Sequence, residues 1–229
     1  MNPHCATIAP VDPTSARPVW SVMIPTYHCA RYLGETLRSV LAQDPGPDAM
    51  QIEVVDDHST QDDPESVVRE VGHGRVGFFR QPANVGITGN FATCLTRSRG
   101  RLVHLLHGDD MVRDGFYASL RRAFDADAAI GAAFCRQIFI NGNGDRIDLS
   151  PLEQAHSGRL DDALARLATE QRIMTPSIVV RRDVYETLGG FDDRLRCSED
   201  WEMWVRIASR YPVWYETEPL ALYRMHANS

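Results

Sequence analysis

Short apolar runs alternate with helix-like segments through residues 19–137, and this alternation constrains the fold more than any other feature. The apolar runs span residues 19–25, 52–57, 75–80, 102–107 and 130–137. Segments with apolar residues at helical spacing or with helix-start signals lie between them, at residues 30–43, 64–71, 90–99 and 115–124. Such alternation is typical of a layered α/β domain with a largely parallel sheet, and we predict that fold class.

The pattern is less regular in the second half, where we expect a small antiparallel addition. Residues 141–145 (NGNGD) are typical of a turn between two antiparallel strands. A helix is expected at residues 160–170, a strand at 177–181 and an amphipathic helix at 199–210. Residues 1–18 are rich in proline and small polar residues, and we expect a flexible N-terminal extension there.

Charge and cysteine content narrow the class of function. The net charge is −7, whereas proteins that bind nucleic acid by neutralising phosphates are usually basic. All 24 basic residues are arginine, which excludes lysine-based Schiff-base and P-loop chemistry. No apolar run approaches the ~20 residues that cross a bilayer. The five cysteines form no C-x-x-C pair, and their scattered positions favour reduced thiols in a cytoplasmic protein.

Three of the predicted strands end in polar residues that we expect to meet. Residues 25–27 (PTY), 56–57 (DD) and 107–110 (HGDD) each lie at the end of an apolar run. In a parallel sheet the carboxyl ends of the strands lie at one edge, and ligands bind in the crevice beyond that edge. The pattern alone therefore places these three segments around one ligand site.

The two acidic pairs, Asp56–Asp57 and Asp109–Asp110, indicate a cation in that crevice. Four carboxylates brought together repel one another unless positive charge lies among them. Oxygen ligands with room for water and phosphate suit Mg²⁺ or Mn²⁺, so we expect a divalent metal. The alternative is that one aspartate of each pair caps the helix that follows, a position that aspartate favours.

The sequence contains no glycine-rich phosphate loop of the common kinds. No G-x-G-x-x-G follows the first strand, and no G-x-x-x-x-G-K-[ST] occurs anywhere. Nicotinamide-dependent dehydrogenases and P-loop nucleotidases are therefore disfavoured. A nucleotide whose phosphates are held through a metal remains open.

The segment from Ser198 to Trp201 (SEDW) opens the last amphipathic helix. Ser198 stands at the N-cap position, and the dipole of the helix favours the acids beside it, Glu199 and Asp200. A carboxylate held beside a second acidic cluster is also suited to act as a general base. His226 has no pattern of its own, and a lone histidine is more often structural than a ligand.

Taken together and in order, these motifs resemble those of the family 2 glycosyltransferases, which are inverting enzymes of the GT-A fold that use nucleotide-sugar donors. The resemblance covers about residues 19–228. It rests on the segments VMIPTY (22–27), IEVVDDHSTQD (52–62), NVGITGN (84–90), GRLVHLLHGDD (100–110), GGFDDRLRCSEDWEMWVRIA (189–208) and LYRMHANS (222–229).

The resemblance implies a GT-A type, single Rossmann-like α/β/α catalytic domain at residues 19–229. Its nucleotide-binding half would span about residues 19–110, and its acceptor-side half about 111–229. Asp200 would be the catalytic base, with Glu199 as the second choice. The implied metal ligands are Asp109, Asp110 and His226. The implied nucleotide-binding residues are Pro25, Thr26, Tyr27, Asp57, Asn84, Gly86, Asn90, His107 and Gly108.

One position departs from the family's pattern. The first aspartate of its Asp-x-Asp motif is His107 here, whereas Asp109 matches the second aspartate. The resemblance therefore makes Asp109 the principal metal ligand, with Asp110 as the neighbouring alternative and His107 in reach of a ribose or the metal. Arg181 and Arg224 are further candidates for a contact with phosphate or acceptor.

The expected reaction is metal-dependent transfer of a hexose, with inversion, from a nucleoside diphosphate donor to an acceptor hydroxyl. UDP-sugars are the favoured donors, Mn²⁺ or Mg²⁺ the cofactor, and a glycan, a lipid-linked molecule or a protein the acceptor. We expect a cytoplasmic enzyme of bacterial-type cell-surface polysaccharide synthesis. It would have no nucleic-acid partner and at most a peripheral association with a membrane.

Two other functions are weighed against this one. The first is a GT-A module that binds a nucleotide sugar without catalysis, because of His107. The second is a nucleotidyltransferase that makes the sugar nucleotide, which is disfavoured because the first strand is not followed by a glycine-rich basic loop.

Overall fold

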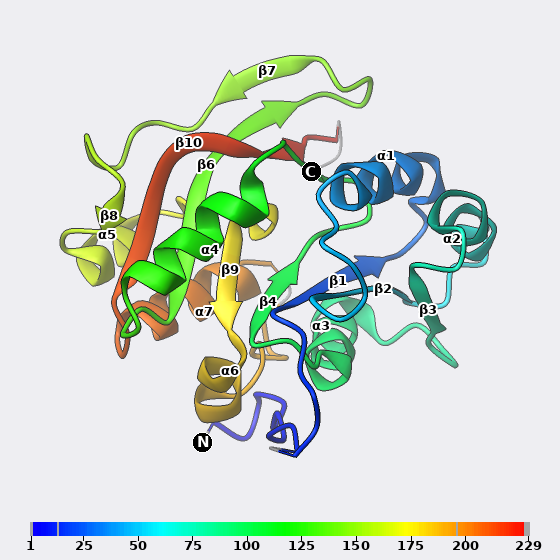
Figure 1. Cartoon of the computed structure of the whole chain (residues 1–229), viewed down its shortest axis with the longest axis horizontal. Coiled ribbons are helices and arrows are strands. Elements are labelled where there is room, and N and C mark those ends of the chain that lie inside the picture. The colour runs from blue at the N-terminus through cyan, green and yellow to red at the C-terminus, as the bar shows by residue number, and fades with distance from the viewer. Residues whose placement is uncertain (1, 13, 196, 227–229) are drawn as a thin grey trace.

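Four parallel strands from the first 105 residues form one half of a central sheet (Figure 1). The computed structural model describes residues 2–12, 14–195 and 197–226. The parallel strands are β1 (Trp20–Thr26), β2 (Met50–Asp56), β3 (Gly77–Arg80) and β4 (Leu102–Leu105). The helices that connect them in turn are α1 (Ala30–Leu41), α2 (Pro64–Gly72) and α3 (Gly86–Arg97). This half has the arrangement that the strand–helix alternation predicts.

The rest of the chain extends the same sheet. Its strands are β5 (Met111–Val112), β6 (Ala132–Ile140), β7 (Arg146–Leu149), β8 (Gly158–Arg159), β9 (Ile178–Arg181) and β10 (Val213–Arg224). Its helices are α4 (Phe116–Ala126), α5 (Ala163–Thr169), the short 3₁₀ helix η1 (Thr175–Ser177), α6 (Arg182–Leu188) and α7 (Glu199–Ala208).

Within the described residues, the strands follow the spatial order β3-β2-β1-β4-β9-β6-β10-β5, with β7 paired to β6 and β8 to β10. Strand β9 runs antiparallel to both of its neighbours, whereas β6 and β10 are parallel to each other. The turn predicted at residues 141–145 joins the antiparallel strands β6 and β7. The predicted fold class, an α/β domain with a mostly parallel sheet and an antiparallel addition, is confirmed.

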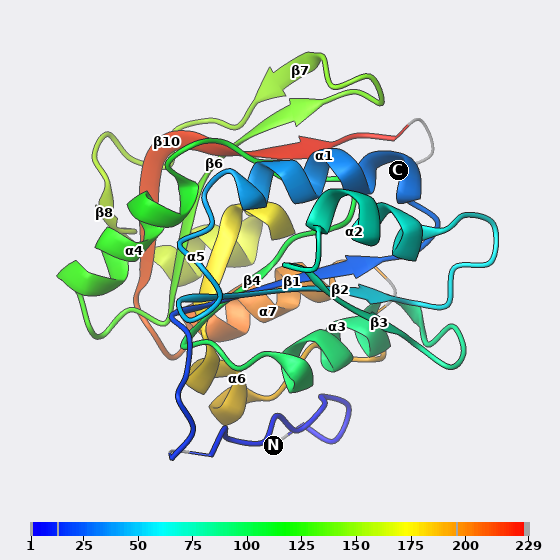
Figure 2. The ribbon, with the colours of Figure 1, turned by 45° about the vertical axis from the view of Figure 1, so that its right-hand side comes forward.

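Helices cover both faces of the sheet (Figure 2). Residues of α1, α2 and α4 form one apolar core with the sheet, and residues of α3, α5, α6 and α7 form the other. Successive side chains of a strand point to opposite faces, so the central strands contribute to both cores. In β1, Val22 and Ile24 face the first core and Met23 faces the second, and all three are fully buried.

The start of α2 agrees with the prediction from the sequence, whereas the start of α3 does not. Helix α2 begins at Pro64, as predicted for residues 64–71, and the Asp63 side chain caps it by accepting a hydrogen bond from the Ser66 N–H. Helix α3 instead begins at Gly86, four residues before its predicted start. The glycines of this segment are typical of a turn, but the Asp57 carboxylate accepts hydrogen bonds from Val85 N–H and Gly86 N–H and so caps the helix.

The N-terminal residues lie against the domain, which differs from the free extension expected from their composition. Ile8 is buried, and Cys5 forms a β-bridge with Asp192. The carbonyl of Ala6 accepts a hydrogen bond of 2.7 Å from Gly190 N–H. The expectation of a flexible extension is corrected here. The Ile8 side chain is buried, and backbone groups of this segment form hydrogen bonds with residues that follow α6.

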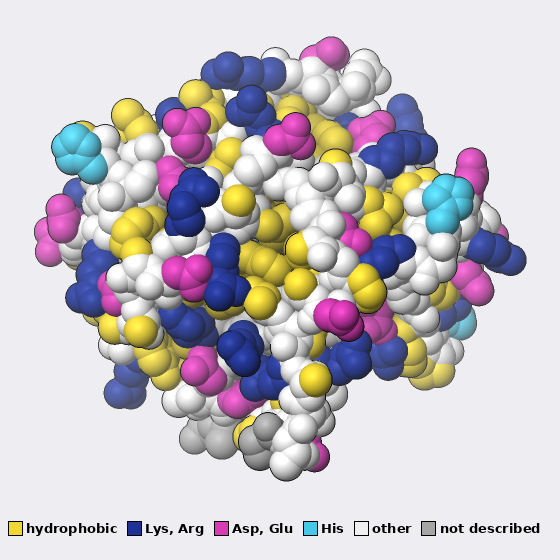
Figure 3. Space-filling view, viewed as in Figure 1, with side chains coloured by type: hydrophobic (Ala, Val, Ile, Leu, Met, Phe, Trp, Pro, Cys, Tyr) yellow, Lys and Arg dark blue, Asp and Glu magenta, His cyan; other side chains and the backbone are white. Residues whose placement is uncertain are grey.

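The surface and the thiols agree with the composition. In the view of Figure 3, arginine and acidic side chains are interspersed over the face that carries α4 and β10. All five cysteines lie in the described part of the chain, and each is a free thiol. No helix among the described residues is both long enough and apolar enough to cross a bilayer.

Candidate functional site

A pocket of about 370 Å³ lies where the sequence predicts a ligand site, beyond the carboxyl ends of β1, β2 and β4. Backbone hydrogen bonds hold these ends in register, because the Thr26 carbonyl accepts from Asp57 N–H and the Pro25 carbonyl accepts from Gly108 N–H. The predicted nucleotide-binding residues all line this pocket: Pro25, Thr26, Tyr27, Asp57, Asn84, Gly86, Asn90, His107 and Gly108. The expected convergence of the three strand ends is therefore present.

Gly108 is required for the close approach of two of these ends. A Cβ atom at this position would lie 2.7 Å from both Cys29 Sγ and Thr26 Oγ1, closer than real Cβ contacts. Glycine therefore lets the segment after β4 pack directly on the segment after β1. Cys29 also lines the pocket, and burial raises the pKa of its thiol to about 12, so it remains protonated.

Asp57 fixes the segment Asn84–Gly86, which lines part of the pocket. Its Oδ1 accepts from Val85 N–H at 2.7 Å and its Oδ2 from Gly86 N–H at 3.0 Å, while its carbonyl accepts from Asn84 Nδ2 at 3.2 Å. Burial raises the pKa of the Asp57 carboxyl, and the two backbone donors oppose that rise. The helix-capping interpretation placed an aspartate of this pair at the start of the helix that follows, but Asp63 caps that helix, α2. Asp57 instead caps α3, and its side chain also borders the pocket.

Asp56 has a different environment, so the four carboxylates do not gather in one cluster. It is fully buried, and its carboxylate accepts hydrogen bonds from Arg80 Nε at 2.7 Å and from Ser59 Oγ at 2.5 Å. These partners balance its charge without a metal ion. The expectation that both acidic pairs share one cation is therefore wrong for Asp56.

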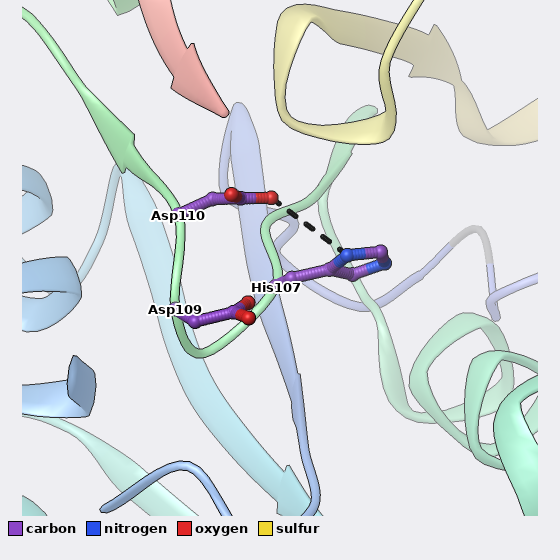
Figure 4. A group of neighbouring side chains, drawn as sticks. All are labelled: His107, Asp109 and Asp110. Carbon is purple, nitrogen blue, oxygen red and sulfur yellow. Dashed lines mark ion pairs between the residues drawn. The ribbon is translucent and has the colours of Figure 1, made fainter. Parts of the chain in front are cut away.

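The second acidic pair lies beside His107 in the segment after β4 (Figure 4). One ligand atom each of His107, Asp109 and Asp110 lies within 4.8 Å of the others. Asp110 Oδ1 accepts from Arg224 N–H at 2.8 Å, but its Oδ2 lies 3.7 Å from His107 Nδ1, too far for a hydrogen bond. Burial and the neighbouring Asp109 raise the pKa of Asp110, and burial lowers the pKa of His107.

These residues fit a divalent cation. Among the described residues, neither Asp110 Oδ2 nor His107 Nε2 has a hydrogen-bond partner, although both atoms are buried. His226 Nε2 lies 2.7 Å from Asp109 Oδ2, so the end of the chain reaches the same group. The three residues predicted as metal ligands, together with His107, thus form one group of oxygen and imidazole donors.

The two arginines considered for phosphate or acceptor binding have structural partners instead. Arg224 is buried, and its guanidinium donates to the Asp109 carbonyl at 2.8 Å and to Glu35 Oε2 at 2.7 Å. Arg181 donates to the Ile130 carbonyl at 2.8 Å. The interpretation of both as substrate contacts is corrected, since carbonyl and carboxylate groups of the protein take up their donors.

Two acids, Glu199 and Asp200, lie in the first turn of α7. Asp200 is partly exposed, and its carboxylate accepts from Gln171 Nε2, from Thr175 Oγ1 and from Trp201 N–H. Glu199 is buried, and its Oε2 has no hydrogen-bond partner among the described residues. Burial raises the pKa of both carboxyls.

Ser198 precedes these acids with φ 71°, and its side chain makes no capping hydrogen bond. The N-cap position is therefore as predicted, without the predicted type of bond. The left-handed backbone at this position turns the chain directly into α7.

The candidate base Asp200 and the group after β4 influence one another electrostatically. Burial raises the pKa of Asp200, whereas the hydrogen bonds from Trp201 N–H and Thr175 Oγ1 and, to a smaller extent, the neighbouring His107 lower it. Burial raises the pKa of the Tyr223 hydroxyl to about 12, and Asp110, Asp109 and Asp200 all contribute to that rise. Asp200 and the acids after β4 therefore act on one side chain of β10.

Sequence reasoning missed several residues of this site. The pKa of Tyr223 responds to Asp110, Asp109 and Asp200. Gln171 and Thr175 donate hydrogen bonds to Asp200, and Phe91 stacks on His107 with ring centroids 5.5 Å apart. Tyr223 stands in the YRMH segment, so the resemblance could have indicated it. The loop position of Gln171 carries no local signal.

Two family models match the sequence. Residues 21–189 match the model described as glycosyl transferase family 2, which is more than half of the chain. Residues 152–229 match a second model, described as glycosyltransferase like family 2.

Curated relatives agree with this match. An uncharacterized protein of Mycobacterium tuberculosis, MT1568, is 27% identical over 96% of this chain and 70% of its own length. The uncharacterized glycosyltransferase MG025 of Mycoplasma genitalium is 28% identical over 56% of this chain and 43% of its own length. The uncharacterized glycosyltransferase RT0329 of Rickettsia typhi is 23% identical over 91% and 64%, respectively.

Solved structures share the fold at low identity. TarS 1-349 of S. aureus in complex with UDP has a TM-score of 0.73 and 17% identity, over 90% of this chain and 60% of that chain. The mannosyltransferase PcManGT of Pyrobaculum calidifontis, in complex with GDP-Man and Mn²⁺, has a TM-score of 0.68 and 23% identity, over 94% and 59%. The chain thus spans about 60% of these two structures. From the family match, together with the fold and the site, we conclude that the chain belongs to glycosyl transferase family 2.

Proposed function

We propose that the protein transfers a sugar, with inversion, from a nucleoside diphosphate donor to an acceptor hydroxyl. The observation that carries the proposal is the assembly of three parts in one site of a family 2 chain. These parts are a pocket at the strand ends, the group formed by His107, Asp109 and Asp110, and the partly buried carboxylate of Asp200. UDP-sugars are the favoured donors, since TarS is solved with UDP and with UDP-GlcNAc, whereas PcManGT is solved with GDP-Man.

The nucleoside would occupy the 370 Å³ pocket. Tyr27, 50% exposed, and Ile87, 45% exposed, give its mouth an apolar surface on which a base can stack. The oxygens of Asp57 can still accept a hydrogen bond from a base, because a carboxylate has about four acceptor positions. Asn84 and Asn90 line the same pocket and offer amide groups to the ribose.

The diphosphate would lie against the segment after β4. Asp109, Asp110 and His226, with His107 beside them, would hold a divalent cation, Mn²⁺ or Mg²⁺, and this cation would supply Lewis-acid stabilisation of the leaving diphosphate. Arg224 fixes both residues, because its guanidinium donates to the Asp109 carbonyl and its backbone N–H donates to Asp110 Oδ1. The acids are thus held in place before the donor binds.

Asp200 would accept the proton of the acceptor hydroxyl. The hydroxyl oxygen attacks the anomeric carbon opposite the leaving phosphate, and this single displacement inverts that centre. Burial raises the pKa of Asp200 and so brings it nearer to neutral pH, where a general base is more effective. Glu199 is the second choice for this role.

The acceptor is proposed by class only. A glycan, a lipid-linked molecule or a protein would present its hydroxyl at the Asp200 side of the site. We further propose a role in bacterial-type cell-surface polysaccharide synthesis, in the cytoplasm and with peripheral association with a membrane. The five free thiols support the cytoplasmic part of this proposal.

The Asp200→Asn variant tests the function directly. We expect unchanged donor affinity, because the base faces the acceptor, and a fall in turnover of about 10²-fold or more, because the amide cannot accept the proton. The measurement is nucleoside diphosphate release from a panel of UDP-sugars and GDP-mannose with Mn²⁺ and a panel of glycan and lipid-linked acceptors, alongside donor-induced shifts in melting temperature. Donor binding without turnover in the parent protein would favour the non-catalytic module, and equal turnover in parent and variant would exclude Asp200 as the base.

A further inference from the structure

The carboxylate of Asp200 has every acceptor position filled. Trp201 N–H donates to Oδ1 at 2.7 Å, and Thr175 Oγ1 donates to Oδ2 at 3.2 Å. The amide Nε2 of Gln171 lies 3.0 Å from both oxygens. An ionised carboxylate offers about four acceptor positions, so these contacts leave none open.

A general base needs one open position, because the hydroxyl that it deprotonates must first donate a hydrogen bond to it. With four positions filled, neither an acceptor hydroxyl nor a water molecule can donate to Asp200. One of the three donors therefore has to leave before Asp200 can act. The identity of that donor decides what controls the base.

Two of the three donors are fixed by the fold. Trp201 N–H belongs to the first turn of α7, and the indole of Trp201 donates to the Leu167 carbonyl. Thr175 is 3% exposed and lies on η1, whose Pro176 carbonyl is bonded to the buried His104. Moving either donor would break buried contacts of the domain.

Gln171 is held less firmly. It lies in the irregular segment 170–174 between α5 and η1, and it is partly exposed to solvent. Its flexible side chain reaches Asp200 from this segment, so a rotation about its own bonds can withdraw the amide without moving the backbone. Gln171 is therefore the one of the three donors that an incoming group can replace.

We propose that Gln171 caps the catalytic base Asp200 and is displaced by the acceptor hydroxyl. While the donor is bound without an acceptor, Gln171 then prevents water from donating a hydrogen bond to Asp200. This inference rests on the proposed function and adds a positioning residue that favours transfer over hydrolysis. In the suppressed side reaction, water attacks the anomeric carbon, its proton passes to Asp200, and the bond from the anomeric carbon to the diphosphate oxygen breaks. The products are the free sugar and the nucleoside diphosphate. Exclusion of water from reactive groups is a general function of closed active sites.

The variant Gln171→Met tests the cap, because methionine has a similar length and carries no donor. We expect donor hydrolysis without acceptor to rise by about 3- to 10-fold, the factor that corresponds to one lost hydrogen bond. The assay uses the full chain with Mn²⁺, UDP-sugars and GDP-mannose, and it measures nucleoside diphosphate release. Melting temperatures with and without donor report folding and donor binding in the same samples.

Two further variants make the result specific. Gln61→Ala removes an exposed glutamine of the loop after β2, and it should hydrolyse donor at the parent rate. The double variant Gln171→Met with Asp200→Asn should lose the increase, because the water then has no base to donate to. An increase that persists in the double variant would show that water acts without Asp200, and it would overturn the cap.

The outcomes separate this inference from the function on which it rests. Equal or slower hydrolysis in Gln171→Met than in the parent, with equal donor binding, would overturn the cap and leave the transferase proposal intact. If no donor of the panel shifts the melting temperature of the parent, the proposed function fails and the cap fails with it.

Discussion

Neighbouring aspartates in this protein have unlike environments, and the difference sets what each can do. Asp56 is fully buried with Arg80 and Ser59 as partners, whereas the adjacent Asp57 points at the start of α3 and borders the pocket. Likewise, Asp109 is bonded to His226, whereas Asp110 is buried, and one of its oxygens has no hydrogen-bond partner in the described part of the chain. In the first pair, a structural residue thus stands beside a residue of the pocket, whereas both residues of the second pair belong to the candidate metal group.

At the residue scale, a substitution of Asp109 tests whether the group after β4 binds a divalent metal. We expect Asp109→Ala to weaken the Mn²⁺-dependent part of UDP binding by at least about 10- to 100-fold, the loss that even indirect support of a metal ligand causes. Binding measured by calorimetry with Mn²⁺ and with chelator gives this difference. Asp114→Ala removes an exposed acid five residues further along and serves as the control. Equal UDP affinity with Mn²⁺ and with chelator in the parent would refute the metal assignment.

At the scale of elements, a buried histidine joins three of them behind the site. His104 of β4 lies 3.2 Å from the Tyr117 hydroxyl of α4 and 3.0 Å from the Pro176 carbonyl of η1. The next residue back along the chain, Thr175, donates to Asp200. This histidine therefore fixes the part of the chain that supports the candidate base.

His104 makes the stability depend on pH. Burial lowers its pKa to about 4, so the unfolded chain binds a proton near pH 6.5 that the folded protein does not bind. The contribution of His104 to stability is then nearly constant well above pH 6.5 and falls as the pH drops through 6.5 towards 4. Between pH 7 and pH 5 we expect a loss of about 1–2 kcal/mol.

The comparison with His104→Gln isolates this effect. Glutamine can still donate to the Pro176 carbonyl and does not titrate, so the variant should lose less stability between the two pH values. Urea unfolding at pH 7 and pH 5 measures the difference, and His156→Gln, at an exposed position, should behave like the parent. A parent and a His104→Gln variant with the same pH dependence would contradict the assignment.

Local patterns explain why some elements could be predicted and others could not. The strands β1, β2 and β4 and the turn at 141–145 follow from apolar runs and turn residues, and their polar ends locate the pocket. Strand β10 escapes prediction because Pro219 interrupts it and its pairing with β6 shifts register on either side of that residue. Gln171 and Arg224 form hydrogen bonds with residues that lie 29 and 189 positions away in the sequence. A local sequence pattern cannot predict contacts between residues so far apart.

At the scale of the molecule, the two halves of the chain meet at the site, and the N-terminal residues pack near the start of α3 and on the turn after α6. The first half supplies the pocket, and α7 and the end of β10 supply Asp200 and His226. Residues 2–9 pack on the turn that follows α6, where Asp193 N–H donates to the His4 carbonyl. Residues 2–9 therefore contact residues 190–193, the segment that leads along the chain to Asp200.

The burial of Ile8 predicts that this segment contributes to stability. Ile8 is 1% exposed, and we expect Ile8→Ala to lower the free energy of unfolding by about 2–4 kcal/mol. Thr7→Ala changes an exposed neighbour and should cost much less. Urea unfolding of both variants and the parent gives the comparison. If the two variants are equally stable, residues 2–9 behave as the free extension that their composition suggests.

The contact between Asp109 and His226 has a consequence for the order of folding. These residues are 117 positions apart, and Arg224 is 189 positions from its partner Glu35. Contacts of such separation carry a large cost in loop-closure entropy, so we expect them to form late. The parallel strands of the first half can fold before the acids after β4 acquire their full set of neighbours. A ligand held by Asp109 and His226 together would therefore stabilise the entire chain against unfolding, and not the first half alone.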